Sequence, residues 1–227
     1  PSSSSFSGPL ARAGGTLFLV ANDGEHGDEL WKSDGTEAGT SLVLDIYPGP
    51  YGSFPSQLTA LQGTLVFSAY EDAHGGELWR SDGTGAGTYP LVDILPGATS
   101  SSPRVIGRAG SFVYFTAGYY YTTLFKTDGT AAGTSFVRGT YARLNNSLGV
   151  EYQGMFFFTA RSYASELELW TSDGTEGGTY IMAAWPVVPN LGDVGALSEF
   201  IEFQGALYFS LSFGDGEHVE LWKTHGN

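Results

Sequence analysis

The sequence predicts an all-β fold, namely a five-bladed β-propeller of four-stranded antiparallel blades in which the last blade has three strands. The main observation is a recurring segment that begins Glu-Leu-Trp and continues into Asp-Gly-Thr. Its aromatic residue falls at Trp31, Trp79, Phe125, Trp170 and Trp222, so successive copies are 48, 46, 45 and 52 residues apart. A period of this size, built from short apolar runs and Gly-rich turns, is typical of β architectures that repeat blade by blade.

The repeats run from one end of the chain to the other, which indicates one domain spanning residues 1–227. The approximate repeat units are 1–47, 48–95, 96–142, 143–190 and 191–227. Aromatic residues make up 15% of the chain and 33 of its 227 residues are Gly, a composition that suits strands joined by tight turns. We therefore expect a single closed β-propeller domain.

Each repeat unit is expected to contain four short strands. The units align on the turn glycines Gly15, Gly63, Gly110, Gly154 and Gly205. In the second unit the strands are expected at residues 57–61, at residues 64–68, around Glu77-Leu78-Trp79, and at residues 89–94. These segments are rich in β-branched and aromatic residues and are bounded by Gly, Pro, Ser or Asp, as strands of an antiparallel meander are.

Apolar residues on both faces of the second strand predict how the units assemble. Leu65, Val66 and Phe67 are apolar at successive positions, so both faces of that strand are expected to be buried. Blades stacked in a ring bury both faces of every sheet. The repeated aromatic residues named above are therefore expected to pack between blades rather than to bind a ligand.

The Asp-Gly-Thr stretch is expected to stabilise a hairpin turn. An Asp side chain accepts hydrogen bonds from the following main-chain N–H groups, Gly supplies a positive φ, and Thr hydroxyls bind the remaining backbone groups. The structural turn residues are Asp34, Asp82, Asp128 and Asp173. A calcium loop is the alternative for these residues, although each turn offers a single carboxylate and calcium takes about six to eight oxygen ligands.

Charge and composition disfavour several classes of partner. The chain has 10 Lys and Arg against 24 Asp and Glu, and its net charge of -14 repels nucleic acids and anionic membrane surfaces. No apolar run approaches the ~18 residues of a membrane-spanning helix, so the chain is not expected to span a membrane. Because Cys is absent, disulfides, thiolate metal sites and cysteine nucleophiles are excluded. No cofactor is expected.

These motifs resemble the bacterial ELWxxDGTxxGT repeat family, and the resemblance covers essentially the whole chain. Units one, two and four match the motif closely, whereas unit three has Thr123-Leu124-Phe125 and unit five stops at His225-Gly226-Asn227. The resemblance implies an exported bacterial propeller that is extracellular, attached to the cell surface or periplasmic. A start at Pro1 agrees with a processed or partial chain. Similar five-bladed propellers include sugar-binding lectins.

Binding residues are sought where the repeats differ, because the shared residues build the frame and loops carry function. The connection between the second and third strands differs most, and it holds His in units one, two and five but aromatic residues in units three and four. The connections into the next unit should lie on the same edge, which we call the variable rim. The candidate binding residues there are Tyr51, Phe54, Tyr70, His74, Tyr119, Tyr120, Tyr121, Tyr163, His26 and His218.

Closure of the ring would place units five, one and two side by side and make one sector of the variable rim acidic and rich in His. A solvated polar rim is the favoured interpretation of that sector, and a metal site is the alternative. Equivalent loops on neighbouring blades lie at least ~10 Å apart. A single loop that contains Asp23, His26 and Asp28 would therefore have to bind the ion alone.

The favoured function is a non-enzymatic extracellular module for binding or assembly that holds a glycan or a surface protein. A glycoside-hydrolase-type enzyme is one alternative, with Glu151, Glu199 and Glu202 as candidates for carboxylates that need to lie about 5–9.5 Å apart. Another alternative is a structural subunit of a larger surface or membrane-associated assembly. Unit five lacks its outer strand, so we expect strand donation by a partner, or residues outside this sequence, to complete that edge.

Overall fold

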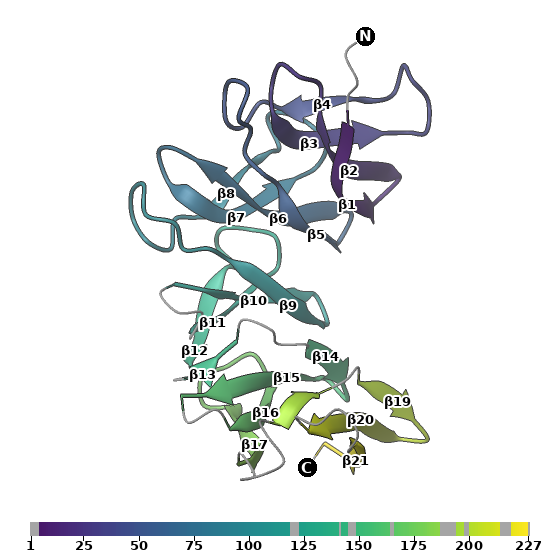
Figure 1. The fold of residues 1–227 in the computed structure, drawn as a ribbon, viewed down its shortest axis with the longest axis vertical. Helices are drawn as coiled ribbons and strands as arrows, with labels where there is room; N and C mark the ends of the chain where they lie inside the picture. The colour runs from purple at the N-terminus through teal and green to yellow at the C-terminus, as the bar shows by residue number, and fades with distance from the viewer. Residues whose placement is uncertain are drawn as a thin grey trace.

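The computed structural model describes residues 5–118, 123–140, 142–144, 149–163, 166–186, 194–197, 200–213 and 219–226. Within these residues the chain is all-β, and five antiparallel sheets follow one another along the sequence, which confirms the predicted fold class (Figure 1). This part of the chain contains no helix long and apolar enough to cross a membrane.

The first three sheets each contain four strands, which pair in chain order. The first sheet consists of β1 (Ser5–Ala13), β2 (Thr16–Asn22), β3 (Asp28–Ser33) and β4 (Ser41–Leu44). The second consists of β5 (Ser56–Leu61), β6 (Thr64–Glu71), β7 (Gly75–Ser81) and β8 (Tyr89–Val92). The third consists of β9 (Arg104–Ala109), β10 (Phe112–Ala117), β11 (Thr123–Thr127) and β12 (Ser135–Gly139).

The last two sheets each begin with a divided strand. The fourth sheet consists of β13 (Ala142–Arg143), β14 (Gly149–Tyr152), β15 (Met155–Ser162), β16 (Leu167–Ser172) and β17 (Thr179–Trp185). The fifth consists of β18 (Val194–Leu197), β19 (Ile201–Phe203), β20 (Ala206–Phe213) and β21 (Val219–Thr224). In the fourth sheet β13 and β14 both pair with β15, and in the fifth β18 and β19 both pair with β20.

The fifth sheet has three rows of strands, as predicted for the last blade. Strand β21 pairs with residues 207–212 of β20, whereas β18 and β19 pair with residues 211–213 and 206–208 of the same strand. Because a strand has two edges, β18 and β19 must share one edge of β20 and β21 must occupy the other. Among the described residues no strand pairs with the outer edge of β21.

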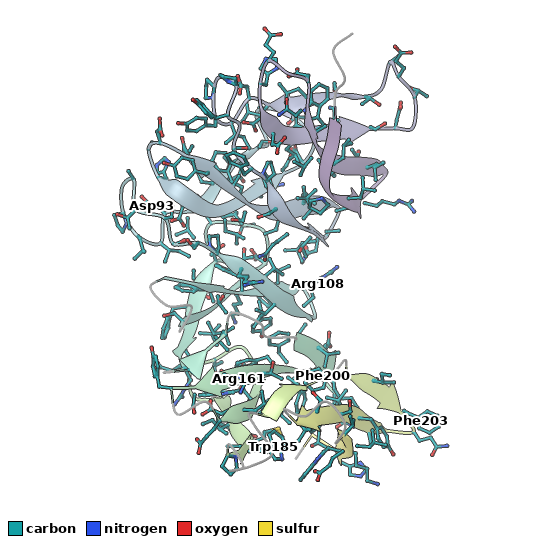
Figure 2. All side chains as sticks on the ribbon, viewed as in Figure 1. Asp93, Arg108, Arg161, Trp185, Phe200 and Phe203 are labelled. Atoms are coloured by element: carbon teal, nitrogen blue, oxygen red, sulfur yellow. The ribbon has the colours of Figure 1, made fainter. Side chains whose placement is uncertain are left out.

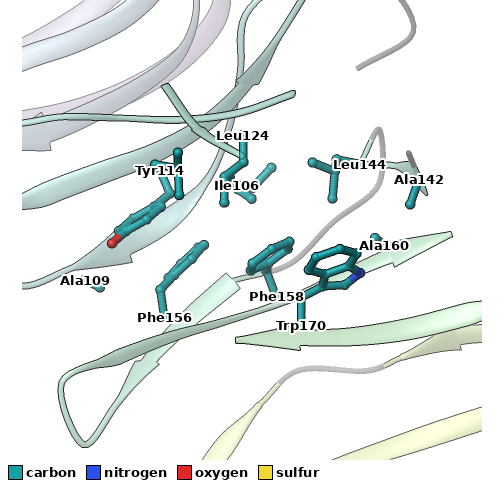
Figure 3. Packing of buried hydrophobic residues seen from close by; sticks show 11 residues of the cluster. Ile106, Ala109, Tyr114, Leu124, Ala142, Leu144, Phe156, Phe158, Ala160 and Trp170 are labelled. Atoms are coloured by element: carbon teal, nitrogen blue, oxygen red, sulfur yellow. The ribbon is translucent and has the colours of Figure 1, made fainter. Parts of the chain in front are cut away.

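Apolar clusters fill each of the four spaces between successive sheets in the described part of the chain. In β6, Leu65 and Phe67 face the first sheet and Val66 faces the third, which confirms that both faces of this strand are buried. Between the third and fourth sheets, Tyr114 stacks on Phe156 with a distance of 4.1 Å between ring centroids (Figure 3). The core is therefore a series of interfaces between sheets rather than one central cluster.

The repeated aromatic residues pack between sheets in the middle of the molecule but not at its end. Trp79 and Trp170 are 5% and 4% exposed, and Phe125 is partly buried against the cluster between the second and third sheets. Trp31 is also partly buried. Trp222 departs from the expectation because it is 39% exposed, although its ring contacts that of Trp185 at 5.4 Å. In the described part of the chain β21 is an edge strand, so no further strand shields this ring at the outer side of the sheet.

The structure does not confirm the expected closure of the ring. The sheets form an open arc, and the first and fifth sheets lie at opposite ends of the long axis (Figure 1). Four interfaces are enough to bury the facing sides of five sheets, so burial of the apolar clusters does not require closure. In this arrangement the fifth sheet does not adjoin the first. The loop of unit five that contains His218 lies outside the described residues, so the sector of acidic residues and His stays a prediction. The last sheet leaves Phe203 and Leu221 59% and 75% exposed, and Phe203 projects from the molecule (Figure 2).

Candidate functional site

Each Asp-Gly-Thr turn is held by the same hydrogen bonds, at the opposite end of the third strand from the variable rim. In the first turn Asp34 Oδ1 accepts hydrogen bonds from Thr36 N at 2.9 Å and Thr36 Oγ1 at 2.8 Å. Thr36 Oγ1 in turn accepts one from Gly39 N at 3.0 Å. The same bonds recur in the turns that begin at Asp82, Asp128 and Asp173. The Thr hydroxyl and then the Thr N–H hold the pKa of each of these carboxyls below its usual value.

A buried glutamate ties the connecting segments of the first two sheets to the frame. Glu29 Oε1 accepts hydrogen bonds from the N–H groups of Tyr47 and Ser53 at 2.9 Å each, and Glu29 Oε2 accepts one from Ser53 Oγ at 2.6 Å. Glu77 binds Ser101 in the same way, with its N–H at 2.9 Å and its Oγ at 2.5 Å. Burial raises the pKa of both glutamates, and these hydrogen bonds oppose the rise. The first residue of the Glu-Leu-Trp motif therefore anchors the segment that leads to the next sheet.

The two kinds of loop on the variable rim lie side by side. Tyr70, near the end of β6, donates its N–H to Ser53 O at 2.9 Å, and its ring centroid lies 5.7 Å from that of Tyr47. In the first sheet, Asp28 forms an isolated parallel bridge with Gly52. The connecting segment at residues 47–55 therefore forms one surface with the start of β3 and the end of β6.

A hollow with a volume of about 270 Å³ opens on this rim between the second and third sheets. The side chains that matter for its chemistry are Ser53, Phe54, Gln57, Tyr70, Ser102 and Arg104. They come from the starts of β5 and β9, from the segments just before them, and from the end of β6. Phe54 is 59% exposed although its ring is apolar. The structure thus brings together two of the predicted binding residues, Phe54 and Tyr70.

Backbone strain is concentrated at this hollow. In the described part of the chain six residues other than Gly have positive φ, and three of them precede the Gly of two-residue hairpin turns, namely Gln62, Gln153 and Gln204. The other three are Phe54 (51°), Gln57 (56°) and Ser102 (50°), and all three line the hollow. Residues held in such conformations cost on the order of 1–3 kcal/mol each and cluster at functional sites.

The two described histidines of the variable rim are bound by carboxylates of their own loops. His26 Nδ1 lies 2.7 Å from Asp23 Oδ2, and this bond raises the pKa of His26. The N–H groups of His26 and Glu25, together with the imidazole, lower the pKa of Asp23 to about 2. His74 pairs with Glu71, and its pKa is also raised. Among the described residues no group of three or more His, Cys, Asp or Glu is placed to hold a metal ion.

The remaining predicted binding residues are not gathered at the hollow. Tyr51 lies on the neighbouring connecting segment and is highly exposed. Tyr163, which directly follows β15, is exposed and is not among the residues that line the hollow. The other predicted residues lie outside the described part of the chain, and these are Tyr119, Tyr120, Tyr121 and His218.

The structure describes two of the three carboxylates considered for glycoside hydrolysis. Glu151 Oε2 accepts a hydrogen bond from Gly110 N at 2.7 Å, which ties the fourth sheet to the third. Glu202 is exposed on β19, and Glu199 lies outside the described residues.

Five residues of this region were not predicted from the sequence, namely Gln57, Ser102, Arg104 and the anchoring glutamates Glu29 and Glu77. A signal for the anchors was present, because Ser53-Phe54-Pro55 and Ser101-Ser102-Pro103 each begin 24 residues after the Glu of the preceding motif. That fixed spacing repeats in the first two units. Nothing comparable marked Arg104, whose place depends on how the second and third sheets pack.

A comparison with models of protein families finds no match, and a comparison with curated proteins finds none either. Among solved structures, a prolyl endopeptidase is 15% identical, with a TM-score of 0.53 over 93% of this chain and 31% of that chain. A puromycin hydrolase mutant is 14% identical, with a TM-score of 0.53 over 86% of this chain and 32% of that chain. This chain therefore spans about a third of the length of each of these two proteins, 31% and 32% respectively. A lectin, SapL1, is 13% identical with a TM-score of 0.47 over 99% and 79% of the two chains, too low a score to support an argument.

These comparisons overturn the expectation that the chain is not an enzyme. The two solved structures with TM-scores of 0.53 come from a peptidase and a hydrolase. At 15% and 14% identity the likeness shows a propeller-like fold alone. The architecture therefore gives no ground for excluding catalysis.

Proposed function

We propose that the chain binds a glycan in the hollow between the second and third sheets. The observation that carries this proposal is the clustering of Phe54, Gln57 and Ser102, all with positive φ, around one open hollow. Such strain persists only where the surrounding structure enforces it, and the buried pairs of Glu29 with Ser53 and Glu77 with Ser101 provide that support.

The chemistry of the hollow suits a sugar. Phe54 and Tyr70 offer aromatic rings on which the apolar face of a pyranose can stack, and both rings are partly exposed. Gln57 and the Ser102 hydroxyl supply hydrogen-bonding groups for sugar hydroxyls. A volume of about 270 Å³ lies just below the ~300–1,000 Å³ of ordinary ligand pockets, which fits a terminal sugar residue better than a long chain.

The resemblance to the ELWxxDGTxxGT family supports two further parts of this proposal. We propose that the chain belongs to that family and that it is exported. An exported protein meets polysaccharides at a cell surface, where a glycan-binding rim has a use.

Binding to a printed array of diverse glycans tests this function. The wild-type chain should bind a defined subset, and Phe54→Asn and Tyr70→Ala should each weaken that binding roughly tenfold or more. Asn tolerates the positive φ at position 54, so this variant should fold. Tyr180→Ala, which changes an exposed ring on β17, should bind as the wild type does. Failure of the wild type to bind any glycan, or equal binding by both rim variants, would contradict the proposal.

A second candidate is assembly with a partner protein through β21. This strand pairs only with β20 among the described residues, and Leu221 on it is 75% exposed. An open edge with apolar side chains can accept a strand from another chain. Light scattering over a range of concentrations tests whether Leu221→Asp abolishes self-association or the capture of a partner strand. A wild type that stays monomeric and binds no added strand would argue against it.

A further inference from the structure

The hollow carries an arginine without an ionic partner. Arg104 begins β9 and is exposed, and its side chain forms no ion pair or hydrogen bond with the described residues. Arg80 and Arg138 differ, because they donate hydrogen bonds to Tyr89 Oη at 3.1 Å and Glu176 O at 2.9 Å. The guanidinium of Arg104 is therefore available to a ligand.

No Asp or Glu lines the hollow among the described residues, although the chain has 24 acidic residues. An adjacent hollow on the same rim is acidic, because Glu71 and Asp72 line it. Two carboxylates lie behind the lining residues, but both are fully buried and already accept hydrogen bonds, Glu29 from Ser53 and Glu77 from Ser101. In a chain with a net charge of -14, this hollow therefore offers an exposed cation that no carboxylate among its lining residues neutralises.

We infer that the hollow selects a saccharide that carries a carboxylate, and that Arg104 determines this specificity. The inference rests on the glycan-binding function proposed above. A guanidinium donates two parallel hydrogen bonds to a carboxylate, so it recognises the shape of the group as well as its charge. The sugar ring then stacks on Phe54 or Tyr70 while the carboxylate reaches Arg104 at the opposite wall.

Gln57 adds a second donor beside Arg104. Its Oε1 accepts a hydrogen bond from Val105 N at 2.5 Å, which joins β5 to β9 and fixes the amide in place. This bond leaves Gln57 Nε2 to donate to the ligand. Because the rest of the chain is strongly acidic, the fit is to an isolated carboxylate and not to a dense polyanion such as a heavily sulfated polysaccharide.

Matched pairs of glycans test the inference directly. The array should carry uronic acids beside the neutral sugars of the same stereochemistry, methyl esters of the same uronic acids, and sulfated sugars. The wild type should prefer the carboxylates over their neutral and esterified counterparts, and rising salt should weaken that preference. Arg104→Gln should weaken carboxylate binding roughly tenfold to a hundredfold while leaving any weak neutral binding unchanged.

The matched control is Arg108→Gln. Arg108 is also exposed, but it lies near the other end of β9 (Figure 2). This variant should keep the full preference for carboxylates. Arg104→Lys keeps the charge but loses the paired donors, so it should recover only part of the preference.

The outcomes separate the two proposals. Binding of neutral glycans that depends on Phe54 but not on Arg104 would overturn the specificity and leave the glycan-binding function intact. A preference for sulfated over carboxylated sugars would likewise overturn it. An array on which the wild type binds nothing would overturn both.

Discussion

Ser101 Oγ donates a hydrogen bond to Glu77 Oε2 at 2.5 Å, and both side chains are fully buried. Glu29 and Ser53 repeat this pair one unit earlier. Each pair fixes the segment that places a residue with positive φ, Ser102 or Phe54, at the wall of the hollow. The frame of the repeat and the candidate site are therefore linked through two buried carboxylates.

Loss of one of these hydroxyls should destabilise the protein measurably. Ser101→Ala leaves a buried carboxylate short of one charge-assisted hydrogen bond, so the free energy of unfolding should fall by about 1.5–3 kcal/mol. Urea denaturation measures this change in the free energy of unfolding. Ser111→Ala, at an exposed position, should change the free energy of unfolding by less than about 0.5 kcal/mol. Equal effects in the two variants would refute the anchoring role.

The Gly that precedes the final Thr of the DGTxxGT motif should not tolerate a side chain. A Cβ on Gly87 would lie 2.1 Å from Asp82 Oδ1, so Gly87→Ala must displace the carboxylate that holds the turn. We expect the free energy of unfolding to fall by about 1–2 kcal/mol. Gly85→Ala is the control, because its Cβ would meet Val43 O at an ordinary 3.5 Å and Ala131 already stands at the equivalent position. A smaller effect at Gly87 than at Gly85 would contradict this account.

His26 and His74 should titrate above the ordinary imidazole value of about 6.5. Asp23 raises the pKa of His26 and Glu71 raises that of His74. Because the folded pKa is raised, the stabilising contribution of each pair is complete below the unfolded value and is lost as pH rises through the folded value. NMR titration measures both midpoints. Asp23→Asn should lower the midpoint of His26 alone, and a matching drop at His74 would speak against separate pairs.

Removal of an indole from an interface between sheets should cost far more than removal from the open edge. Trp79 is 5% exposed and its ring centroid lies 6.5 Å from that of Phe67, so Trp79→Ala should lower the free energy of unfolding by about 3–5 kcal/mol. Trp222→Ala, at a residue 39% exposed, should cost less than half as much. Chemical denaturation of the two variants measures and compares these losses in the free energy of unfolding. Similar losses would mean that the last sheet is covered in solution.

Relief of strain at the hollow should raise stability and reduce binding. Ser102→Gly removes the cost of a positive φ of 50°, so the free energy of unfolding should rise by about 1 kcal/mol. Its loss of a hydroxyl should weaken glycan binding. Ser111→Gly, in the turn between β9 and β10 where the native φ is not positive, should instead lower stability by about 0.4–1 kcal/mol, because Gly adds conformational freedom to the unfolded chain. A Ser102→Gly variant less stable than the wild type would show that the backbone is unstrained there.

Much of the frame could be predicted because its signals are local. The period of the Glu-Leu-Trp segment predicted five sheets, and the apolar run at Leu65, Val66 and Phe67 predicted two buried faces. The Asp-Gly-Thr turn closes within a few residues, as the bond from Thr36 N to Asp34 Oδ1 shows. Phe54 and Tyr70 could be chosen as candidates because they stand where the repeats differ.

The hollow itself could not be predicted in the same way. Gln57 meets Val105 from 48 residues away, and Arg104 comes from a different sheet than Phe54 or Tyr70. Both placements depend on the angle and offset between the second and third sheets. Ring closure is not confirmed by the structure, because the repeat specifies each sheet and its apolar faces but not the rotation from one sheet to the next.

By itself the sequence determined the number of sheets, their antiparallel strands and the turn chemistry, because these follow from the period of the repeat and from hydrogen bonds over short spans of chain. Only the tertiary structure decided that the sheets form an open arc, that buried glutamates anchor the connecting segments, and that Arg104 faces a hollow without carboxylates. Those features depend on packing between distant segments, where small rotations accumulate and side chains far apart in sequence meet.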